Sequence, residues 1–134
     1  SVAKLRAELQ DIMQNHFGVF RRGDFMQDGI KKLGTLRERI ANVHLEDKSQ
    51  TFNTARIEAL ELENLFEVAQ ATAIAAEARN ESRGAHARDD FRERDDENWL
   101  CHSMFFPNDK RVAKRDVNFS PKTVDTMEPQ IRSY

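Results

Sequence analysis

The sequence predicts a small, mostly helical protein: three long amphipathic helices followed by an irregular C-terminal extension that holds a short β-hairpin. Three observations lead to this fold class. Apolar residues recur at spacings of three and four over most of the first 80 residues. Of the 134 residues, 39% are hydrophobic and 33% are charged, a balance that suits a small helical bundle with a solvated surface. After residue 81 the helical spacing stops, and dense charge gives way to an apolar run suited to a strand.

The first helix is expected over about residues 2–17, where apolar positions form one stripe. Ser1 is a suitable N-cap. Gly18 follows the last apolar residue, at a place where a left-handed C-terminal residue is expected. The stripe consists of Leu5, Leu9, Ile12, Met13 and Phe17.

The second helix is expected over about residues 25–45, because Asp24 followed by Gln27 resembles a capping box. Gly29 and Gly34 lie inside it, and each costs about 1 kcal/mol relative to alanine. Close approach of a neighbouring helix or of another domain would compensate that cost. The apolar stripe consists of Met26, Ile30, Leu33, Leu36, Ile40 and Val43.

The third helix is expected over about residues 54–80, after a polar loop at 46–53, and Gly84 can end any extension of it. Its apolar face is broad, which suggests contact with more than two neighbouring helices. That face includes Ile57, Leu60, Leu62, Leu65, Phe66 and Val68, followed by Ala69, Ala71, Ala73, Ala75, Ala76 and Ala78.

The C-terminal extension begins with a segment dense in both signs of charge, at 81–97. An apolar run at 99–106, a Pro-Asn-Asp-Lys turn and a return run at 112–119 then predict a β-hairpin. A lone two-stranded hairpin is marginal in water, so it should lie on the helices or on a second protein surface. We therefore expect one domain, with helices at 1–80 and an extension at 81–134 packed on them.

Composition excludes several classes of protein. The net charge of −2 provides no basic face for nucleic acid. A single cysteine, Cys101, excludes an internal disulfide and favours a reducing compartment. No apolar run approaches the roughly 20 residues of a membrane span, and no signal peptide is visible. Because the chain starts at Ser1 on a helical pattern, we expect a C-terminal piece of a longer protein or a processed chain.

No complete catalytic, cofactor-binding or metal site is expected. Di-iron bundles pair glutamates with Glu-x-x-His, which these helices lack, so the glutamates of the third helix are better explained as a solvated acidic face. Cys101 and His102 are adjacent and point to opposite faces of a strand, so they cannot easily share a metal. The glycines follow neither the dinucleotide pattern nor the P-loop pattern. The glutamates in question are Glu58, Glu61, Glu63 and Glu67.

The most unusual segment contains Arg83, His86 and Arg88. These cations could together grip an anion or a dicarboxylate, because arginine forks match carboxylates. The alternative is an ion-paired corner, which the excess of neighbouring acids favours. Those acids are Asp89, Asp90, Glu93, Asp95 and Asp96.

Residues 79–91 read Arg-Asn-Glu-Ser-Arg-Gly-Ala-His-Ala-Arg-Asp-Asp-Phe, and residues 94–103 read Arg-Asp-Asp-Glu-Asn-Trp-Leu-Cys-His-Ser. Both runs resemble the C-terminal region of the succinate dehydrogenase flavoprotein subunit, nearest its bacterial form. The ending Pro-Gln-Ile-Arg-Ser-Tyr at 129–134 also resembles that family's terminus. The Glu-Ser-Arg-Gly-Ala-His run is typical of the wider family, which includes the fumarate reductase flavoproteins.

The resemblance implies an up-and-down three-helix bundle of the spectrin-repeat type. It also implies an intact subunit that holds FAD covalently, oxidises succinate to fumarate in the citric acid cycle and passes electrons to an iron–sulfur subunit. The flavin-binding and capping domains would precede this fragment in the same chain. Membrane-anchor subunits would hold the complex at the cytoplasmic face of the bacterial inner membrane. None of the family's catalytic or flavin-binding motifs matches a position here, so the fragment alone is expected to bind no FAD and to be inactive.

From the resemblance we hypothesise that this domain supports the flavin domain and helps present it to the iron–sulfur subunit. Arg83, His86 and Arg88 would form the docking corner, with Trp99 and Phe105 as apolar anchors under the tail. Three alternatives stay open: the same domain of a fumarate reductase, a free-standing helical interaction module, and a minor dicarboxylate site at the corner.

Overall fold

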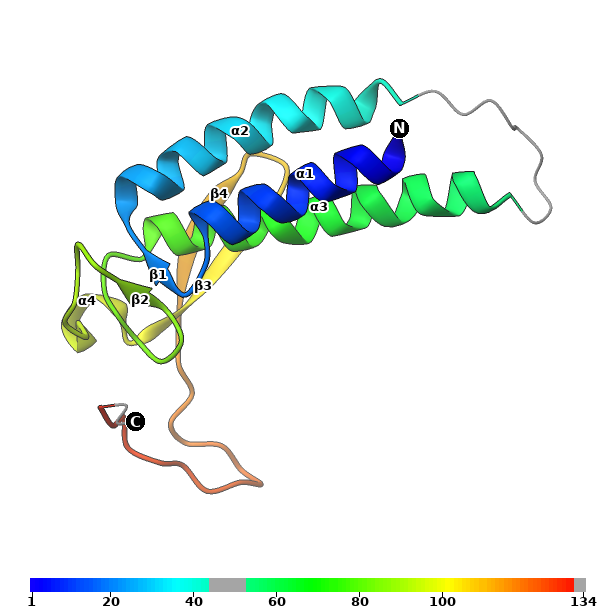
Figure 1. Ribbon diagram of the computed structural model, residues 1–134. Helices are drawn as coiled ribbons and strands as arrows, with labels where there is room; N and C mark the ends of the chain where they lie inside the picture. Colours follow the sequence, from blue (N-terminus) through cyan, green and yellow to red (C-terminus); the bar gives the residue numbers. More distant parts are fainter. Residues whose placement is uncertain (44–52, 132–134) are drawn as a thin grey trace.

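A computed structural model describes residues 1–43 and 53–131. Three long helices account for most of it: α1 (Val2–His16), α2 (Gly23–Ala41) and α3 (Thr54–Ala78). They lie side by side, each running opposite to the one before it in the chain (Figure 1), and each contacts the other two. The prediction of a mostly helical chain with a few small strands is confirmed. The prediction that the second helix ends near 45 is wrong: α2 ends at Ala41, where the Asn42 N–H donates to the Arg39 carbonyl at 3.3 Å in a tightened last turn. The expected loop at 46–53 falls largely outside the described residues.

The hydrophobic core lies where the apolar stripes of the three helices meet. Burying a side chain the size of leucine or phenylalanine contributes about 1.5–3 kcal/mol, so these stripes supply most of the stabilisation of the helices. α1 and the residue after it contribute Leu5, Leu9, Ile12 and Phe17; α2 contributes Met26, Leu33, Leu36 and Ile40; α3 contributes Leu62, Phe66, Ala69, Ala73 and Ala76.

The two ends of α1 are stabilised differently from each other. The Oγ of Ser1 accepts a hydrogen bond from the Lys4 N–H at 3.4 Å, as a helix N-cap does. At the other end, the prediction that Gly18 adopts a left-handed conformation is wrong, because Gly84 is the only glycine with positive φ among the described residues. A glycine suits position 18 for another reason: a Cβ there would lie 2.8 Å from the carbonyl oxygen of Gln14.

The N-terminus of α2 is capped from a distant part of the chain. The predicted capping box is wrong, because the helix begins at Gly23 and Asp24 instead pairs with Arg22, 2.6 Å from its Nε. The Gly23 N–H donates to Oδ2 of Asp90 at 2.9 Å. A carboxylate 67 positions away thus satisfies a helix donor that would otherwise have no acceptor.

The two glycines inside α2 have different surroundings. A Cβ on Gly29 would lie 2.6 Å from both the Cβ of His16 and a ring carbon of Phe17, so α1 and α2 approach too closely there for any side chain. A Cβ on Gly34 would meet nothing within 4 Å among the described residues. The close approach expected for both is therefore observed at Gly29 only.

This difference predicts opposite effects for the same substitution. Gly29→Ala should lower the free energy of unfolding by about 1–3 kcal/mol, because the added methyl group overpacks the α1–α2 contact. Gly34→Ala should raise it by about 0.5–1 kcal/mol, because alanine restricts the unfolded chain and nothing opposes its methyl group. Urea unfolding followed by circular dichroism measures both. Equal effects at the two positions would contradict this account.

The C-terminal extension contains a one-turn helix and a hairpin. α4 (Asp96–Trp99) is followed by β3 (Cys101–Phe106) and β4 (Arg111–Asp116), which pair antiparallel. Trp99 was expected in the first strand but ends α4, because Asp95 caps that turn by accepting from the Asn98 N–H at 3.0 Å. Both strands of the hairpin contact α3, and the tail beyond β4 has no regular structure up to residue 131.

A second, very short sheet joins the beginning of the chain to the extension. β1 (Phe20–Arg21), in the link between α1 and α2, pairs in parallel with β2 (Ala87–Arg88). The Asp89 N–H also donates to the Arg21 carbonyl at 2.8 Å. Strands of two residues have no readable periodicity, so the sequence did not predict this sheet. It places the charged segment beside the end of α3 (Figure 1).

Candidate functional site

Arg88 lies at the centre of a cluster of charged residues between the end of α3 and the hairpin. We call this cluster the ion-paired corner, and it comprises Arg79, Glu81, Arg83, His86, Arg88, Asp90 and Asp96. The Arg88 side chain is only 2% exposed. Its Nε and Nη2 donate to the two carboxylate oxygens of Asp90 at 2.9 and 2.8 Å. A fork of this kind is the strongest common pairing of arginine with a carboxylate.

The remaining nitrogen of Arg88 donates hydrogen bonds to carbonyl oxygens at the C-terminal end of α3. Nη1 donates to the carbonyl oxygens of Glu77 and Arg79 at 2.8 and 3.1 Å, and to Oδ1 of Asn80 at 3.0 Å. The last carbonyls of a helix have no partner within the helix, so a buried cation there replaces water. Since every guanidinium nitrogen of Arg88 binds a protein acceptor, the geometry favours an ion-paired corner over a site for an external anion.

Glu81 is the most deeply buried charged residue of the corner, with no exposed side-chain surface. Its carboxylate accepts from Arg83 (Nε at 2.8 Å and Nη2 at 3.1 Å), from the Asp95 N–H at 2.8 Å, and from Arg79. Burial opposes ionisation, but the hydrogen bonds from Arg83, the Asp95 N–H and Arg79 outweigh it and hold the pKa of Glu81 below its usual value.

Arg79 connects the corner to the hairpin. Besides Glu81, its guanidinium donates to the carbonyl oxygens of Trp99 (at 2.9 Å) and Cys101, and to Oγ of Ser103 at 3.3 Å. It also lies over the Trp99 ring, 5.2 Å from the centroid. One partly buried cation therefore joins the end of α3, α4 and the start of β3.

His86 joins the corner to the link between α1 and α2. Its Nε2 lies 3.0 Å from the Arg79 carbonyl oxygen and its Nδ1 lies 3.0 Å from Nη1 of Arg21. A carbonyl only accepts and a guanidinium only donates, so the ring is neutral with its proton on Nε2. Burial lowers the pKa of His86; the Arg79 carbonyl opposes this effect, and the charges of Arg21, Arg88 and Arg79 add to it.

An open groove of about 890 Å³ runs along the outer side of the corner. Arg83 enters it with Nη2 bound to Oδ1 of Asp96 at 2.6 Å, and Arg94 binds the other oxygen of Asp96 at 3.0 Å. The exposed side chain of Phe20 and the tail at Ile131 complete its walls. The groove presents charged and apolar side chains together.

The ion-paired corner lies within the part of the chain that matches known proteins. A family model described as fumarate reductase flavoprotein C-term matches residues 6–134. The chain belongs to this family. It is 51% identical over 130 residues to a succinate dehydrogenase flavoprotein subunit of Coxiella burnetii, a match that covers 97% of this chain and 22% of the relative. It is 35% identical to a fumarate reductase flavoprotein subunit of Haemophilus influenzae, covering 100% of this chain and 22% of the relative.

Solved structures of proteins named as fumarate reductases have the same fold as this chain. A mutant E. coli quinol fumarate reductase superposes with a TM-score of 0.83 at 35% identity, covering 98% of this chain and 22% of that chain. The chain therefore spans about a fifth of the length of the flavoproteins it matches. The predicted resemblance to the succinate dehydrogenase and fumarate reductase flavoproteins is confirmed.

The structure of this flavoprotein C-terminal domain brings together three of the five residues singled out from the sequence. Arg83, His86 and Arg88 line the same groove. Trp99 does not line the groove and instead lies under the guanidinium of Arg79, whereas Phe105 lies on β3, half-buried and opposite Val112. Their docking role stays a prediction.

Two central residues of the corner, Arg79 and Glu81, were not singled out from the sequence. The alternation of Arg79, Glu81 and Arg83 was a usable signal, because residues two apart in an extended segment lie on one side of the chain. It does not show which carboxylate is buried. Only the packing against α3, α4 and β3 distinguishes Glu81 from the exposed acids that follow it.

Two kinds of feature are absent from residues 1–43 and 53–131. No group of three or more His, Cys, Asp or Glu side chains is arranged to hold a metal ion. Within the same part of the chain, no helix combines the length and the apolar character needed to cross a bilayer.

The corner should make this domain of the flavoprotein family sensitive to acid. The pKa values of His86 and Glu81 are both lowered on folding, and the Arg88 fork lowers the pKa of Asp90. The unfolded chain then binds more protons than the folded chain, so stability falls as the pH falls. His86 should contribute to this loss of stability below its ordinary pKa of about 6.5, and the two carboxylates should contribute to it below about pH 4.5.

Urea unfolding at about pH 7.5 and about pH 5.5 isolates the contribution of the histidine, because most carboxylates stay ionised in that range. His86→Gln should show a smaller loss of stability between the two pH values than the unaltered chain. His102→Gln is the matched control, since His102 is exposed on β3. This variant should lose as much stability between the two pH values as the unaltered chain. An equal pH dependence of stability in both variants would contradict a neutral, half-buried His86.

Proposed function

We propose that this chain is the C-terminal structural and docking domain of the flavoprotein subunit of a succinate dehydrogenase. The observation that carries this proposal is the family match over residues 6–134. The 51% identity to a protein named succinate dehydrogenase flavoprotein subunit, against 35% for one named fumarate reductase, favours the former. The same domain of a fumarate reductase is the second candidate, because the E. coli structure carries that name.

In this proposal the intact subunit binds FAD covalently through residues upstream of this chain. It oxidises succinate to fumarate and passes electrons to an iron–sulfur subunit of a membrane-bound complex. The complex would lie at the cytoplasmic face of the bacterial inner membrane, and this domain would contact the flavin-binding and capping domains of its own chain. The chain itself would bind no FAD and would have no catalytic residue.

The proposed architecture is an up-and-down three-helix bundle of the spectrin-repeat type at 1–80, with the extension at 81–134 packed on it as part of the same domain. The mutual contacts of α1, α2 and α3 and the contacts of β3 and β4 with α3 support this division. The ion-paired corner joins the two parts. Arg83, His86 and Arg88 would present the groove to a neighbour, with Trp99 and Phe105 as apolar supports.

Purification of the parent protein with its partner subunits tests the proposed activity directly. We expect covalently bound flavin and succinate-dependent reduction of a quinone. Rates of succinate oxidation that greatly exceed rates of fumarate reduction would favour a dehydrogenase. A parent protein without flavin would contradict the proposal.

A substitution tests the proposed docking role within that enzyme. Arg83→Ala removes the outermost cation of the corner, so we expect loss of the iron–sulfur subunit or of flavin during gel filtration. Arg111→Ala is a matched control, because Arg111 forms an exposed pair with Asp109 in the hairpin turn, at 3.4 Å, and such pairs contribute about 0–1 kcal/mol. An Arg83→Ala enzyme that stays assembled and turns over normally would contradict the docking role.

A further inference from the structure

The link between α1 and α2, at residues 18–22, is held against the C-terminal extension by a very short sheet and by the side chain of His86. β1 and β2 pair over two residues each, and the Asp89 N–H donates to the Arg21 carbonyl at 2.8 Å. Nη1 of Arg21 lies 3.0 Å from Nδ1 of His86. A pair of short strands is marginal in water on its own, so the hydrogen bond between these two side chains stabilises the position of the link.

The hydrogen bond from Arg21 to His86 exists only while the imidazole is neutral. Nε2 carries the ring proton and donates to the Arg79 carbonyl at 3.0 Å, which leaves Nδ1 as the acceptor for Arg21. A second proton on the ring would occupy Nδ1. Two cationic donors would then face each other at 3.0 Å, so protonation turns an attractive contact into a repulsive one.

The surroundings of His86 favour its neutral form. Burial of the ring disfavours the charged form, and three guanidinium groups from three elements add to this effect. The carboxylates of the corner are each bound to an arginine instead. The three guanidinium groups belong to Arg21 on β1, Arg88 on β2 and Arg79 after α3. Arg83, whose backbone pairs with that of His86, directs its own guanidinium to Glu81 and Asp96.

Arg21 is the cation that is free to move away from a protonated ring. Arg88 is buried and binds a carboxylate and carbonyl oxygens at the end of α3. Arg79 binds a buried carboxylate and two carbonyl oxygens near the start of the hairpin. The other hydrogen bond of the Arg21 side chain, from Nε to the Gly18 carbonyl at 3.2 Å, lies within the link itself. Arg21 can therefore leave His86 without breaking the ion pairs of the corner.

A displacement of Arg21 would change the shape of the groove. Phe20 precedes Arg21 on β1, is 76% exposed and lines the groove together with His86. The described core residues all lie outside positions 18–22. The link can thus move while the core of the three long helices stays packed.

We propose that His86 is a pH-sensitive switch that controls the position of the link between α1 and α2. The neutral ring holds Arg21 and keeps β1 paired with β2. The protonated ring releases Arg21, the two-residue sheet opens, and Phe20 no longer forms a wall of the groove, while the three long helices stay folded. The switch is a property of this chain and requires neither flavin nor a partner subunit.

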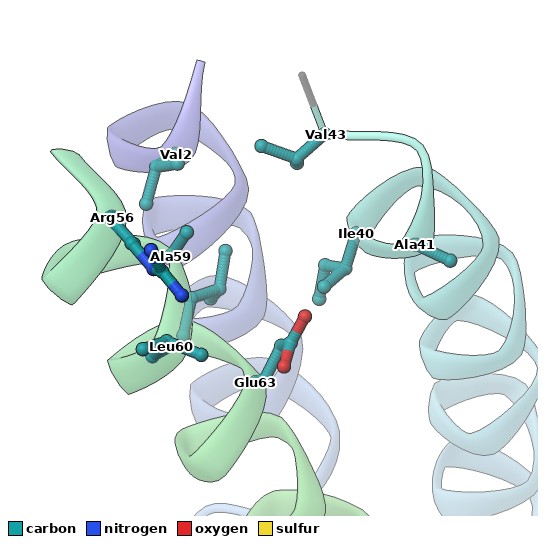
Figure 2. A pocket seen from close by; sticks show the side chains of 9 residues that line it. Val2, Ile40, Ala41, Val43, Arg56, Ala59, Leu60 and Glu63 are labelled. Atoms are coloured by element: carbon teal, nitrogen blue, oxygen red, sulfur yellow. The ribbon is translucent and has the colours of Figure 1, made fainter. Parts of the chain in front are cut away.

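Hydrogen exchange of the 134-residue chain, followed by NMR at about pH 7.5 and about pH 5.0, tests the switch. The Asp89 N–H reports on the sheet, because it donates to the Arg21 carbonyl. Leu62 is the internal reference: it belongs to the core and lines the pocket between Val2 and Ile40 that Figure 2 shows, toward the other end of α3. We expect the protection factor of Asp89 to fall at least about fivefold at the lower pH. It should stay well below that of Leu62 at both pH values, because the link opens without unfolding of the core.

Two variants test whether the proton acts through this contact. His86→Gln has no titrating ring, so its Asp89 protection should change by less than about twofold between the two pH values. Arg21→Gln replaces the cation with an amide, which can donate to a neutral ring or accept from a protonated one. Its Asp89 protection should therefore fall by a smaller factor than in the unaltered chain. His102→Gln is the matched control, because His102 is exposed on β3, and it should show the full fall.

The other outcomes would overturn the switch. A constant protection factor of Asp89 in the unaltered chain would show that the sheet stays closed. Equal protection of Asp89 and Leu62 at the lower pH would show that acid unfolds the whole chain rather than releasing the link. An undiminished fall in His86→Gln would assign the effect to the carboxylates. An undiminished fall in Arg21→Gln would show that Arg21 is not the group that the proton releases.

Discussion

Replacing Arg88 with alanine should lower the free energy of unfolding by about 3–5 kcal/mol, the usual effect of removing one partner from a buried ion pair. The variant leaves the Asp90 carboxylate without its fork and the carbonyl oxygens of Glu77 and Arg79 without a donor. It should also weaken the cap on α2, because Asp90 also accepts from the Gly23 N–H. Urea or thermal unfolding of the 134-residue chain measures the loss.

Two further variants separate geometry from charge. Arg88→Lys keeps the charge but cannot form a planar fork, so it should recover less than half of the lost stability. Arg92→Ala is the matched control: Arg92 is exposed, and among the described residues its side chain makes a single 3.3 Å hydrogen bond, from Nε to the Asp89 carbonyl. It should change the stability by no more than about 0.5 kcal/mol. Equal losses for Arg88→Ala and Arg92→Ala would show that the corner does not hold the fold together.

Glu81→Ala should be similarly damaging, with a loss of about 3–5 kcal/mol. Its removal leaves the guanidinium groups of Arg79 and Arg83 facing each other without the carboxylate between them, and the Asp95 N–H without an acceptor. Detachment of the hairpin should accompany the loss, because Arg79 also binds the Trp99 and Cys101 carbonyls. Hydrogen exchange should therefore accelerate across β3 and β4 before it accelerates in α1.

Glu93→Ala provides the comparison for Glu81→Ala. Glu93 belongs to the same acidic segment but is exposed, so its replacement should change the unfolding free energy by about 0.5 kcal/mol or less. If the two glutamate variants were equally stable, the burial of Glu81 would have no energetic consequence.

The ion-paired corner gives this domain one connected set of polar contacts between parts of the chain that are far apart. Arg21 comes from the link between α1 and α2, Gly23 begins α2, Arg79 follows the last residue of α3, and Cys101 begins the hairpin. Networks of this kind couple the elements they join, since loss of one member leaves several buried partners unsatisfied. A flavoprotein that uses the groove for docking would thereby connect a neighbour to the whole helical part.

The sequence by itself determined the elements whose signals are local. The spacing of apolar residues located α1, α2 and α3, because a helical period of 3.6 can be read from a single segment. Every core residue lies on a predicted apolar face, but four residues of the pattern predicted for the third helix are exposed: Ile57, Leu60, Leu65 and Val68. The Pro-Asn-Asp-Lys turn located the hairpin between β3 and β4. The runs at 79–91 and 94–103 indicated the family, and the acids around Arg88 indicated an ion-paired corner.

Only the tertiary structure decided which distant residues meet. The cap on Gly23 comes from Asp90, the buried acid among many is Glu81, and Gly29 but not Gly34 lies against another helix. Each of these depends on how two segments approach in space, and neither segment alone carries that information. The physical reason is that periodicity and capping patterns report interactions within a few residues, whereas burial and ion pairing depend on the packing of the whole chain.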